Sequence, residues 1–450
     1  MAVECATLDV PLKRDDPAHK EKISLRVIRL PANTPHPASD PFVMLAGGPG
    51  QAASALAPFA AAQVEIRRTR DILLIDQRGT GQSAPLQCAT LDDADDTTLQ
   101  EALTLEIVSR VQRCHEELRE QNRDPLDYGT LHFVADLDDV RRALGVDTMN
   151  IWASSYGTRV ALEYLRRHPE HVRTMVLDGV VDPSISIPTN GWQTRKERLQ
   201  AVLDACAQSE SCRTLWPPPQ EALTALVLKL RAPGINAYIE NPNTGVVETV
   251  TIDSDLVLAA MQSLLYAPET AALLPYVLSR ATYHEDFTPL MAVTRAFSGK
   301  LEGQINPALH YAIICSEDRQ VSDALLNDPL VGTLYQQSVE ACAPWPIAPD
   351  AHELHAPVHN QDVPVLLLSG ALDPVTPPAY AEQVAATLQQ HRTLTAPGYG
   401  HILSMHSCVP SLIAAFVKTA DLQQLPENCV QLLEESTPPF FWPDALAPQP

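Results

Sequence analysis

The hydrophobic pattern of the chain predicts buried strands that alternate with helices. Continuous apolar runs, which are typical of strands covered on both faces, occupy residues 41–45 and 72–75, and further buried strands are expected at residues 174–179 and 363–368. Between two of these runs, Val134, Leu137 and Val140 recur at helical spacing. This alternation predicts an α/β fold with a mostly parallel, doubly wound sheet, whose ligands bind beyond the carboxyl ends of the strands.

The pattern changes between residues 191 and 350. Helical segments there follow one another without parallel strands, at residues 198–207, 220–230, 254–265 and 269–281. We therefore expect three segments. Residues 1–190 form the N-terminal part of the sheet domain, residues 191–350 form a mostly helical insertion, and residues 351–450 form the C-terminal part of the sheet domain.

Charge and hydropathy narrow the classes of partner. The 450-residue chain has a formal net charge of −23, and such a field repels nucleic acids and anionic membrane surfaces. No apolar run approaches the roughly 18 residues that a membrane span requires. We expect a protein with neither nucleic-acid nor membrane partners and with no cofactor. The oligomeric state is open, and a monomer is the working expectation.

Nine cysteines are spread along the chain without the close pairs of a zinc site. Disulfides between sequence neighbours are one hypothesis, although other connectivities and buried thiols in a cytosolic protein stay open. The hypothesis leaves Cys5 single and pairs Cys88 with Cys114, Cys206 with Cys212, Cys315 with Cys342, and Cys408 with Cys429. It implies an oxidising, periplasmic or extracellular compartment. Because no signal peptide is visible after Met1, we interpret the chain as a mature form.

The most informative stretch is the end of the apolar run that precedes Ser155. Ser155 is flanked by Ala153 and Gly157, and a helical pattern begins directly after it. This is the layout of a nucleophile elbow, G-x-S-x-G, with alanine at the first glycine position. Small flanking residues are needed because the serine sits on a strained turn between strand and helix.

Two further candidates lie at the ends of later strands, in the order Ser155, Asp373, His401. Each alone has a simpler interpretation, because Asp373 precedes a proline as turn residues do and His401 follows a glycine-rich loop. Together they predict a catalytic triad in which His401 takes the serine proton and Asp373 orients the imidazole. The backbone N–H groups of Gly48 and Tyr156 are the candidate donors to the oxyanion.

These stretches resemble the α/β-hydrolases of the tripeptidyl-aminopeptidase and prolyl-aminopeptidase type. The matching segments are residues 46–50 (AGGPG), 76–83 (DQRGTGQS), 155–159 (SYGTR) and 176–179 (VLDG), with the regions of Asp373 and His401. The chain departs from the family pattern at Ala46, which replaces a histidine, and at Ala153. The resemblance implies an exported hydrolase with a helical cap, and it supports the proposed cysteine pairs.

The resemblance also implies an acidic site for the substrate's amine. Glu317 is the preferred ligand and Asp318 the second, although a helix-capping or surface acidic pair is the simpler alternative. His352, Glu353, His355 and His359 invite a metal interpretation, but their spacing is not H-E-x-x-H and Pro357 interrupts any helix. We therefore expect no metal site.

Three functions follow from these residues. The first is a serine aminopeptidase that cleaves short peptides from free N-termini through an acyl-enzyme. The second is a carboxylesterase or amidase that uses the same triad on small neutral esters or amides. The third is a binding protein that has kept the fold, which the intact Ser155, Asp373 and His401 argue against.

Overall fold

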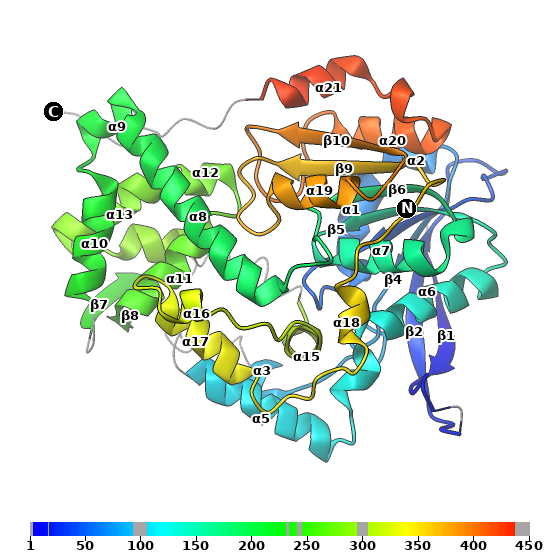
Figure 1. Ribbon diagram of the computed structural model, residues 1–450, viewed down its shortest axis with the longest axis horizontal. Coiled ribbons are helices and arrows are strands. Elements are labelled where there is room, and N and C mark those ends of the chain that lie inside the picture. The colour runs from blue at the N-terminus through cyan, green and yellow to red at the C-terminus, as the bar shows by residue number, and fades with distance from the viewer. Residues whose placement is uncertain are drawn as a thin grey trace.

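The computed structural model describes residues 3–16, 18–92, 106–230, 234–240, 245–294 and 305–436. Its centre is an eight-stranded sheet in the order β1-β2-β4-β3-β5-β6-β9-β10 (Figure 1). β1 and β2 are antiparallel to their neighbours, and the remaining pairs are parallel. The expected α/β fold is confirmed. The strands are β1 (Glu4–Pro11), β2 (Lys22–Leu30), β3 (Phe42–Leu45), β4 (Ile72–Ile75), β5 (Met149–Ser154), β6 (Val172–Asp178), β9 (Val365–Gly370) and β10 (His391–Ala396).

Alternate residues of the central strands enter two different hydrophobic clusters, because successive side chains of a strand point to opposite faces. Leu45, Ala153 and Leu367 pack on one face, against helices α6 (Thr130–Ala143), α7 (Tyr156–Arg167) and α19 (Pro378–Ala385). Met44 and Trp152 pack on the other face, against α1 (Ala57–Ala62), α2 (Val64–Arg67), α20 (Val409–Thr419) and α21 (Glu427–Glu434). Two covered faces explain the continuous apolar runs.

The chain leaves the sheet after β6 and returns to it at β9. The intervening insertion has a hydrophobic cluster of its own and lies beside the sheet (Figure 1). Its elements are α8 (Ile187–Gln208), α9 (Glu210–Leu215), α10 (Pro219–Lys229), β7 (Ile235–Glu240), β8 (Val247–Ile252), α11 (Ser254–Leu264), α12 (Pro268–Ala271), α13 (Leu274–His284), α15 (Pro307–Glu317), α16 (Asp323–Leu326), α17 (Gly332–Ala341) and α18 (Ala351–Leu354).

Three details of the insertion differ from the sequence expectations. α8 begins at Ile187, so the expected boundary at residue 190 falls inside a helix. The boundaries at 190 and 350 stay predictions. The helix expected over 269–281 is two helices, α12 and α13, and Pro275 lies in the first turn of the second, where its missing N–H is tolerated. β7 and β8 form an antiparallel hairpin. Residues 437–450 lie outside the described part of the chain.

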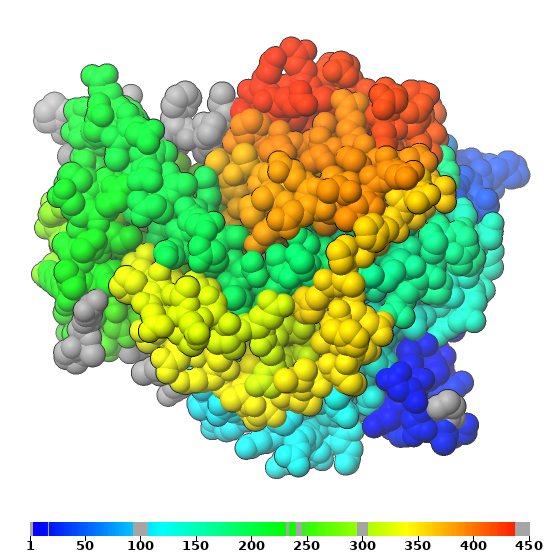
Figure 2. Space-filling view, viewed as in Figure 1, coloured from blue at the N-terminus to red at the C-terminus, as the bar shows by residue number. Residues whose placement is uncertain are grey.

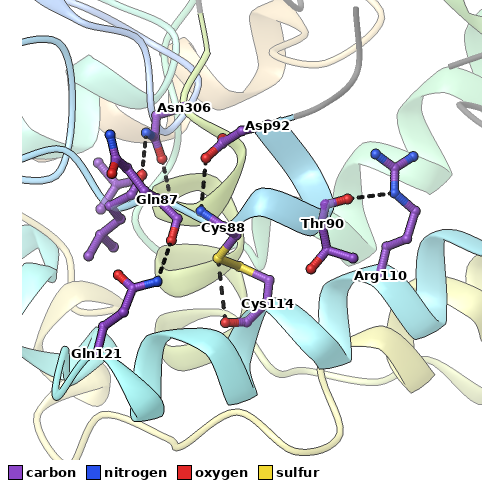
Figure 3. The surroundings of a disulfide bond; sticks show 10 residues. Gln87, Cys88, Thr90, Asp92, Arg110, Cys114, Gln121 and Asn306 are labelled. Carbon is purple, nitrogen blue, oxygen red and sulfur yellow. Dashed lines mark hydrogen bonds between the residues drawn. A yellow bond between two sulfur atoms is a disulfide. The ribbon is translucent and has the colours of Figure 1, made fainter. Parts of the chain in front are cut away.

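The structure forms the four cysteine pairs expected from the sequence, and Cys5 is a free, exposed thiol. Cys88–Cys114 joins the start of α3 (Ala89–Asp92) to α5 (Glu106–Glu120). Around it, Gln121 donates to the carbonyl of Gln87, and Asn306 at the start of α15 donates to that of Leu86 (Figure 3). The disulfide therefore lies next to the segment that binds the N-terminus of α15 through Asn306.

The glycine-rich loop at residues 76–83 has a structural role. The Asp76 carboxylate accepts hydrogen bonds from the backbone N–H and hydroxyl of Ser54. Arg78 is fully buried and makes two hydrogen bonds of 2.6 Å to the Asp136 carboxylate. These contacts fix the loop to the segment around Ser54 and to α6. In the space-filling view, the inserted residues form one continuous surface with the orange C-terminal segment (Figure 2).

Candidate active site

Ser155 lies at the sharp corner between β5 and α7. Its backbone has φ 53° and ψ −129°, a conformation that L-residues rarely adopt. Gly157 is required on the helix side, because a Cβ there would lie 2.5 Å from the carbonyl oxygen of Ala46. A Cβ at Gly47 would lie 2.9 Å from that of Ser155. The glycine loop after β3 thus lies directly against the serine.

Ala153, the departure from the elbow pattern, lies on β5 opposite Leu45 of β3 and Leu177 of β6. Its side chain is completely buried in the cluster under α7. The methyl group therefore fills core space on the strand side of the corner. In contrast to position 157, position 153 tolerates a Cβ.

The imidazole of His401 and the carboxylate of Asp373 form a hydrogen-bonded pair. His401 Nδ1 lies 2.7 Å from Asp373 Oδ2. The backbone N–H groups of Val375 and Thr376 donate to Asp373 Oδ1, and the Thr376 hydroxyl donates to Oδ2 at 2.6 Å. Asp373 is buried, so this set of donors holds the carboxylate in one orientation.

Charge around His401 favours its protonated form. Burial opposes the charge on the imidazole, but the charge and hydrogen bond of Asp373, followed by the charge of Asp178, raise the pKa of His401 above its usual value. Asp178, at the end of β6, accepts hydrogen bonds from the backbone N–H groups of Leu403 and Ser404. It therefore also anchors the loop that follows His401.

Ser155 and His401 line one cavity of about 960 Å³. Gly48 and Tyr156, the expected oxyanion donors, line the same cavity. Tyr156 is the first residue of α7, and N–H groups in a first helical turn have no partner within the helix. The other walls come from α8, α15 and α17 of the insertion. The sheet edge and the insertion thus enclose the serine together.

Glu317 does not take the position expected of an amine ligand. Its two carboxylate oxygens accept hydrogen bonds of 2.6 Å from the backbone N–H and the hydroxyl of Thr130, and it is not among the residues that line the cavity. Burial, the largest influence, raises the pKa of Glu317 to about 7. A carboxyl group directed at Thr130 and partly neutral near pH 7 is a poor ligand for an ammonium group, so the geometry does not favour this role for Glu317, which stays a prediction.

Asp318 lines the cavity, but its charge is compensated. Its Oδ2 accepts a hydrogen bond of 2.6 Å from Arg159, and both side chains are almost completely buried. Arg159 also donates to the carbonyl of Ile185. Asp318 Oδ1 is buried and accepts no hydrogen bond among the described residues, but His355 Nε2 lies 3.6 Å from it.

The histidines near residue 355 are not gathered around one point. His355 contacts the carbonyl oxygens of Pro183 and Glu317 at 3.0 Å, whereas His352 and His359 are exposed. Glu353 pairs with Arg167. Within the described ranges, no group of three or more His, Cys, Asp or Glu side chains is placed to hold a metal ion. The described helices also include none that is long and apolar enough to cross a bilayer.

Two residues beside His401 have no sequence signal that would single them out. The Tyr266 ring stands at 88° to the imidazole, with the ring centroids 5.8 Å apart. Arg195 of α8 donates to the Tyr266 hydroxyl at 3.0 Å. Both come from the insertion, far from the elbow in sequence, so only the tertiary structure brings them to His401. Thr376, which binds Asp373, lies three residues after it and could have been found as a local capping residue.

Comparison with known proteins agrees with the topology. Residues 40–214 match a family model described as the alpha/beta hydrolase fold, and residues 328–429 match a model described as TAP-like protein. The chain has the α/β-hydrolase fold. The serine protease Hip1 of Mycobacterium tuberculosis is 26% identical, and the alignment covers 92% of this chain and 84% of that protein.

Two other relatives are named for different hydrolase activities. The tripeptidyl aminopeptidase of Streptomyces coelicolor is 24% identical, with 95% of this chain and 83% of that protein covered. Carboxylesterase B of M. tuberculosis is 34% identical over 229 residues, with 46% of this chain and 42% of that protein covered. The relatives are named as hydrolases that act on peptides and esters, and this chain is a serine hydrolase.

Proposed function

We propose that the enzyme is a serine aminopeptidase that releases residues or short peptides from free N-termini. The observation that carries the proposal is the convergence of Ser155 and the His401–Asp373 pair on one cavity walled by the insertion. The names of the Hip1 and tripeptidyl aminopeptidase relatives support a peptide substrate. The walls that the insertion adds to the cavity favour the end of a chain over an internal segment, because an internal segment must pass through the site in both directions.

In the proposed mechanism, Ser155 attacks the carbonyl carbon of the scissile bond while His401 takes the hydroxyl proton on Nε2. Nδ1 is engaged by Asp373, which fixes the tautomer that leaves Nε2 free to accept a proton. The oxyanion accepts hydrogen bonds from the backbone N–H groups of Gly48 and Tyr156. His401 then protonates the leaving amine, and a water molecule hydrolyses the acyl-enzyme by the same steps in reverse.

Of the two acidic residues expected to bind the amine, we retain Asp318. It lines the cavity, and its Oδ1 accepts no hydrogen bond, although this atom is buried and His355 Nε2 lies 3.6 Å from it. A hydrogen bond from a substrate ammonium group to Oδ1 would leave the ion pair with Arg159 intact. This contact is a proposal for the free N-terminus, and it replaces the role first expected of Glu317.

A carboxylesterase or amidase is the second candidate. It is favoured by the carboxylesterase B relative and by the Asp318–Arg159 pair, which leaves the acidic site without net charge. Matched substrates separate the two functions. An aminopeptidase cleaves a tripeptide anilide with a free amine at least about tenfold faster than its N-acetyl form, since a charged hydrogen bond contributes about 1.5–3 kcal/mol. Equal rates would favour the esterase.

The nucleophile is tested with a fluorophosphonate probe. Ser155→Ala is expected to lose labelling and to lower kcat by a factor of about 10⁴ or more. Ser154→Ala, at the neighbouring serine that lines the same cavity, is the matched control and should keep both. Labelling that persists in Ser155→Ala would reject the assigned nucleophile, and wild-type protein that is not labelled would favour a non-catalytic binding protein.

We also propose a periplasmic or secreted location. The four disulfides of the described chain support it, because structural disulfides persist in oxidising compartments. Fractionation of the source cells with an antibody to the protein tests the location, and recovery in the cytosol with reduced thiols would contradict it.

A further inference from the structure

The charged side chains of the cavity contrast with the charge of the whole chain. The protein has a net charge of −23, yet the charged residues that line the described cavity, histidines aside, are Arg195, Arg319 and Asp318. Asp318 is already neutralised by Arg159. The uncompensated charges are therefore two guanidinium groups in an otherwise acidic protein.

Arg195 is the arginine beside the proposed chemistry. Its Nη2 donates to the Tyr266 hydroxyl at 3.0 Å, and its Cζ lies 5.8 Å from the centre of that ring. The same ring lies edge-on to His401. The charge of Arg195 acts on His401 and opposes protonation of the imidazole. Arg319, in contrast, is exposed and donates to the carbonyl of Trp345.

The guanidinium of Arg195 has unused donor capacity. Arginine carries five N–H donors in a fork that matches a carboxylate, and the bond to Tyr266 uses one of them. Among the described residues, no carboxylate lies within ion-pair distance of Arg195. Arg78 and Arg159, which are buried and have structural roles, each bind an acidic partner, and Arg195 differs from them in this respect.

A second arginine strengthens the positive potential on the same helix. Arg198 follows Arg195 by three residues on α8, so the two side chains share one side of the helix. The Arg198 Nε is buried and has no hydrogen-bond partner in the part of the chain that the structure describes. Asp373 is the carboxylate whose charge acts on Arg198. α8 therefore presents two cations to the region of His401 and Asp373.

We propose that Arg195 binds a carboxylate of the substrate and makes the enzyme selective for anionic substrates. This inference rests on the proposed function, because it assigns the substrate class of the same site. The carboxylate is either an acidic side chain or the free C-terminus of a short peptide. Binding of the carboxylate also screens Arg195 from His401, which favours proton transfer to the imidazole.

Binding to the inactive Ser155→Ala protein tests the charge preference without turnover. Isothermal titration calorimetry compares Ala-Ala-Glu amide with Ala-Ala-Gln amide for the side chain, and Ala-Ala-Gln acid with its amide for the C-terminus. We expect the anionic member of at least one pair to bind about tenfold more tightly, the low end for a charged hydrogen bond. Equal affinities in both pairs would overturn the proposal, whatever the outcome of the fluorophosphonate test.

Variants made in the Ser155→Ala protein test whether Arg195 causes the preference for the anionic peptide. Arg195→Gln is expected to abolish this preference and to leave the affinity for the neutral peptide within about threefold, whereas Arg195→Lys keeps part of the preference. Tyr266→Phe removes the anchoring hydrogen bond but leaves the charge, so the preference should persist in reduced form. Arg213→Gln removes an exposed arginine of α9 outside the cavity and should change nothing. A preference that survives in Arg195→Gln would overturn the assignment.

In the active enzyme, the same variants are compared by kcat/KM on Ala-Ala-Glu and Ala-Ala-Gln p-nitroanilides. If the side chain is the bound carboxylate, the wild type prefers the glutamate substrate about tenfold and Arg195→Gln does not. If the C-terminus is bound, the two anilides are cleaved equally and the preference appears in the acid and amide peptide pair. A preference for the glutamine substrate would contradict the proposal.

Discussion

In the proposed mechanism, the hydrogen bond between His401 and Asp373 sets the pH at which the enzyme gains activity. Asp373 raises the pKa of His401, and only the neutral imidazole can take the serine proton. We expect kcat/KM to rise with pH through an inflection above about 6.5, the ordinary value for histidine. The measurement is kcat/KM on a peptide anilide from pH 5 to 9. A flat profile between pH 5 and 8, or an inflection below 6, would contradict the assigned base.

Glu317 makes stability depend on pH in the opposite sense to a salt-bridged acid. Its pKa is raised to about 7 in the folded protein and is about 4.3 when unfolded, so the folded state binds the proton more tightly. Stability is therefore lost as pH rises from about 4 to 7. In Glu317→Gln, the amide oxygen can accept from the Thr130 N–H and the NH2 group can donate to the Thr130 hydroxyl oxygen, and the substitution removes this loss. We expect the variant to gain stability over the wild type, on the order of 3 kcal/mol, between pH 5 and pH 8.

Urea unfolding at the two pH values measures this difference. Glu353→Gln, at an exposed carboxylate on the surface of α18, serves as the control and should show little change with pH. A Glu317→Gln variant that is destabilised equally at both pH values would show that the carboxylate is not strained by burial.

The sequence indicated the acidic pair but not its environment, because Thr130 is 187 residues away from Glu317 and no local pattern links them.

At the scale of elements, the strands and the corner after β5 were predictable because their signals are local. A strand covered on both faces needs a continuous apolar run, and the turn at Ser155 needs Gly157 because any Cβ at that position would lie 2.5 Å from the carbonyl oxygen of Ala46. The path of α8 was less predictable. Its burial pattern depends on packing within the insertion, and the contact of Arg195 with Tyr266 joins residues 71 apart.

The two flanking positions of the elbow are expected to respond differently to substitution. Ala153→Gly should leave kcat/KM within about threefold and lower stability by about 1–2 kcal/mol, because a buried methyl is lost and the strand gains freedom when unfolded. Gly157→Ala should abolish activity, because the added Cβ would force α7 away from the carbonyl of Ala46. Kinetics on a peptide anilide and urea unfolding measure both effects. Equal effects at the two positions would contradict the asymmetry of the corner.

At the scale of the whole molecule, the Cys315–Cys342 disulfide joins two elements that wall the cavity. Cys315 lies on α15 and Cys342 directly follows α17, and Cys342 lines the cavity itself. Pairing between neighbouring cysteines was one hypothesis among many connectivities, and the family resemblance supported it. The position of the Cys315–Cys342 bond at the cavity was not predictable, because it depends on how the insertion packs on the sheet.

We expect the double variant Cys315→Ala/Cys342→Ala to lose about 3 kcal/mol of stability, the typical contribution of a disulfide that closes a loop of this length. Because α15 and α17 wall the cavity, KM for a peptide anilide should rise as well. Cys206→Ala/Cys212→Ala is the matched control, since that bond closes a separation of 6 rather than 27 residues and neither cysteine lines the cavity. Its loss of stability should be smaller and KM should stay unchanged. If both double variants raised KM equally, the Cys315–Cys342 bond would have no special part in shaping the substrate site.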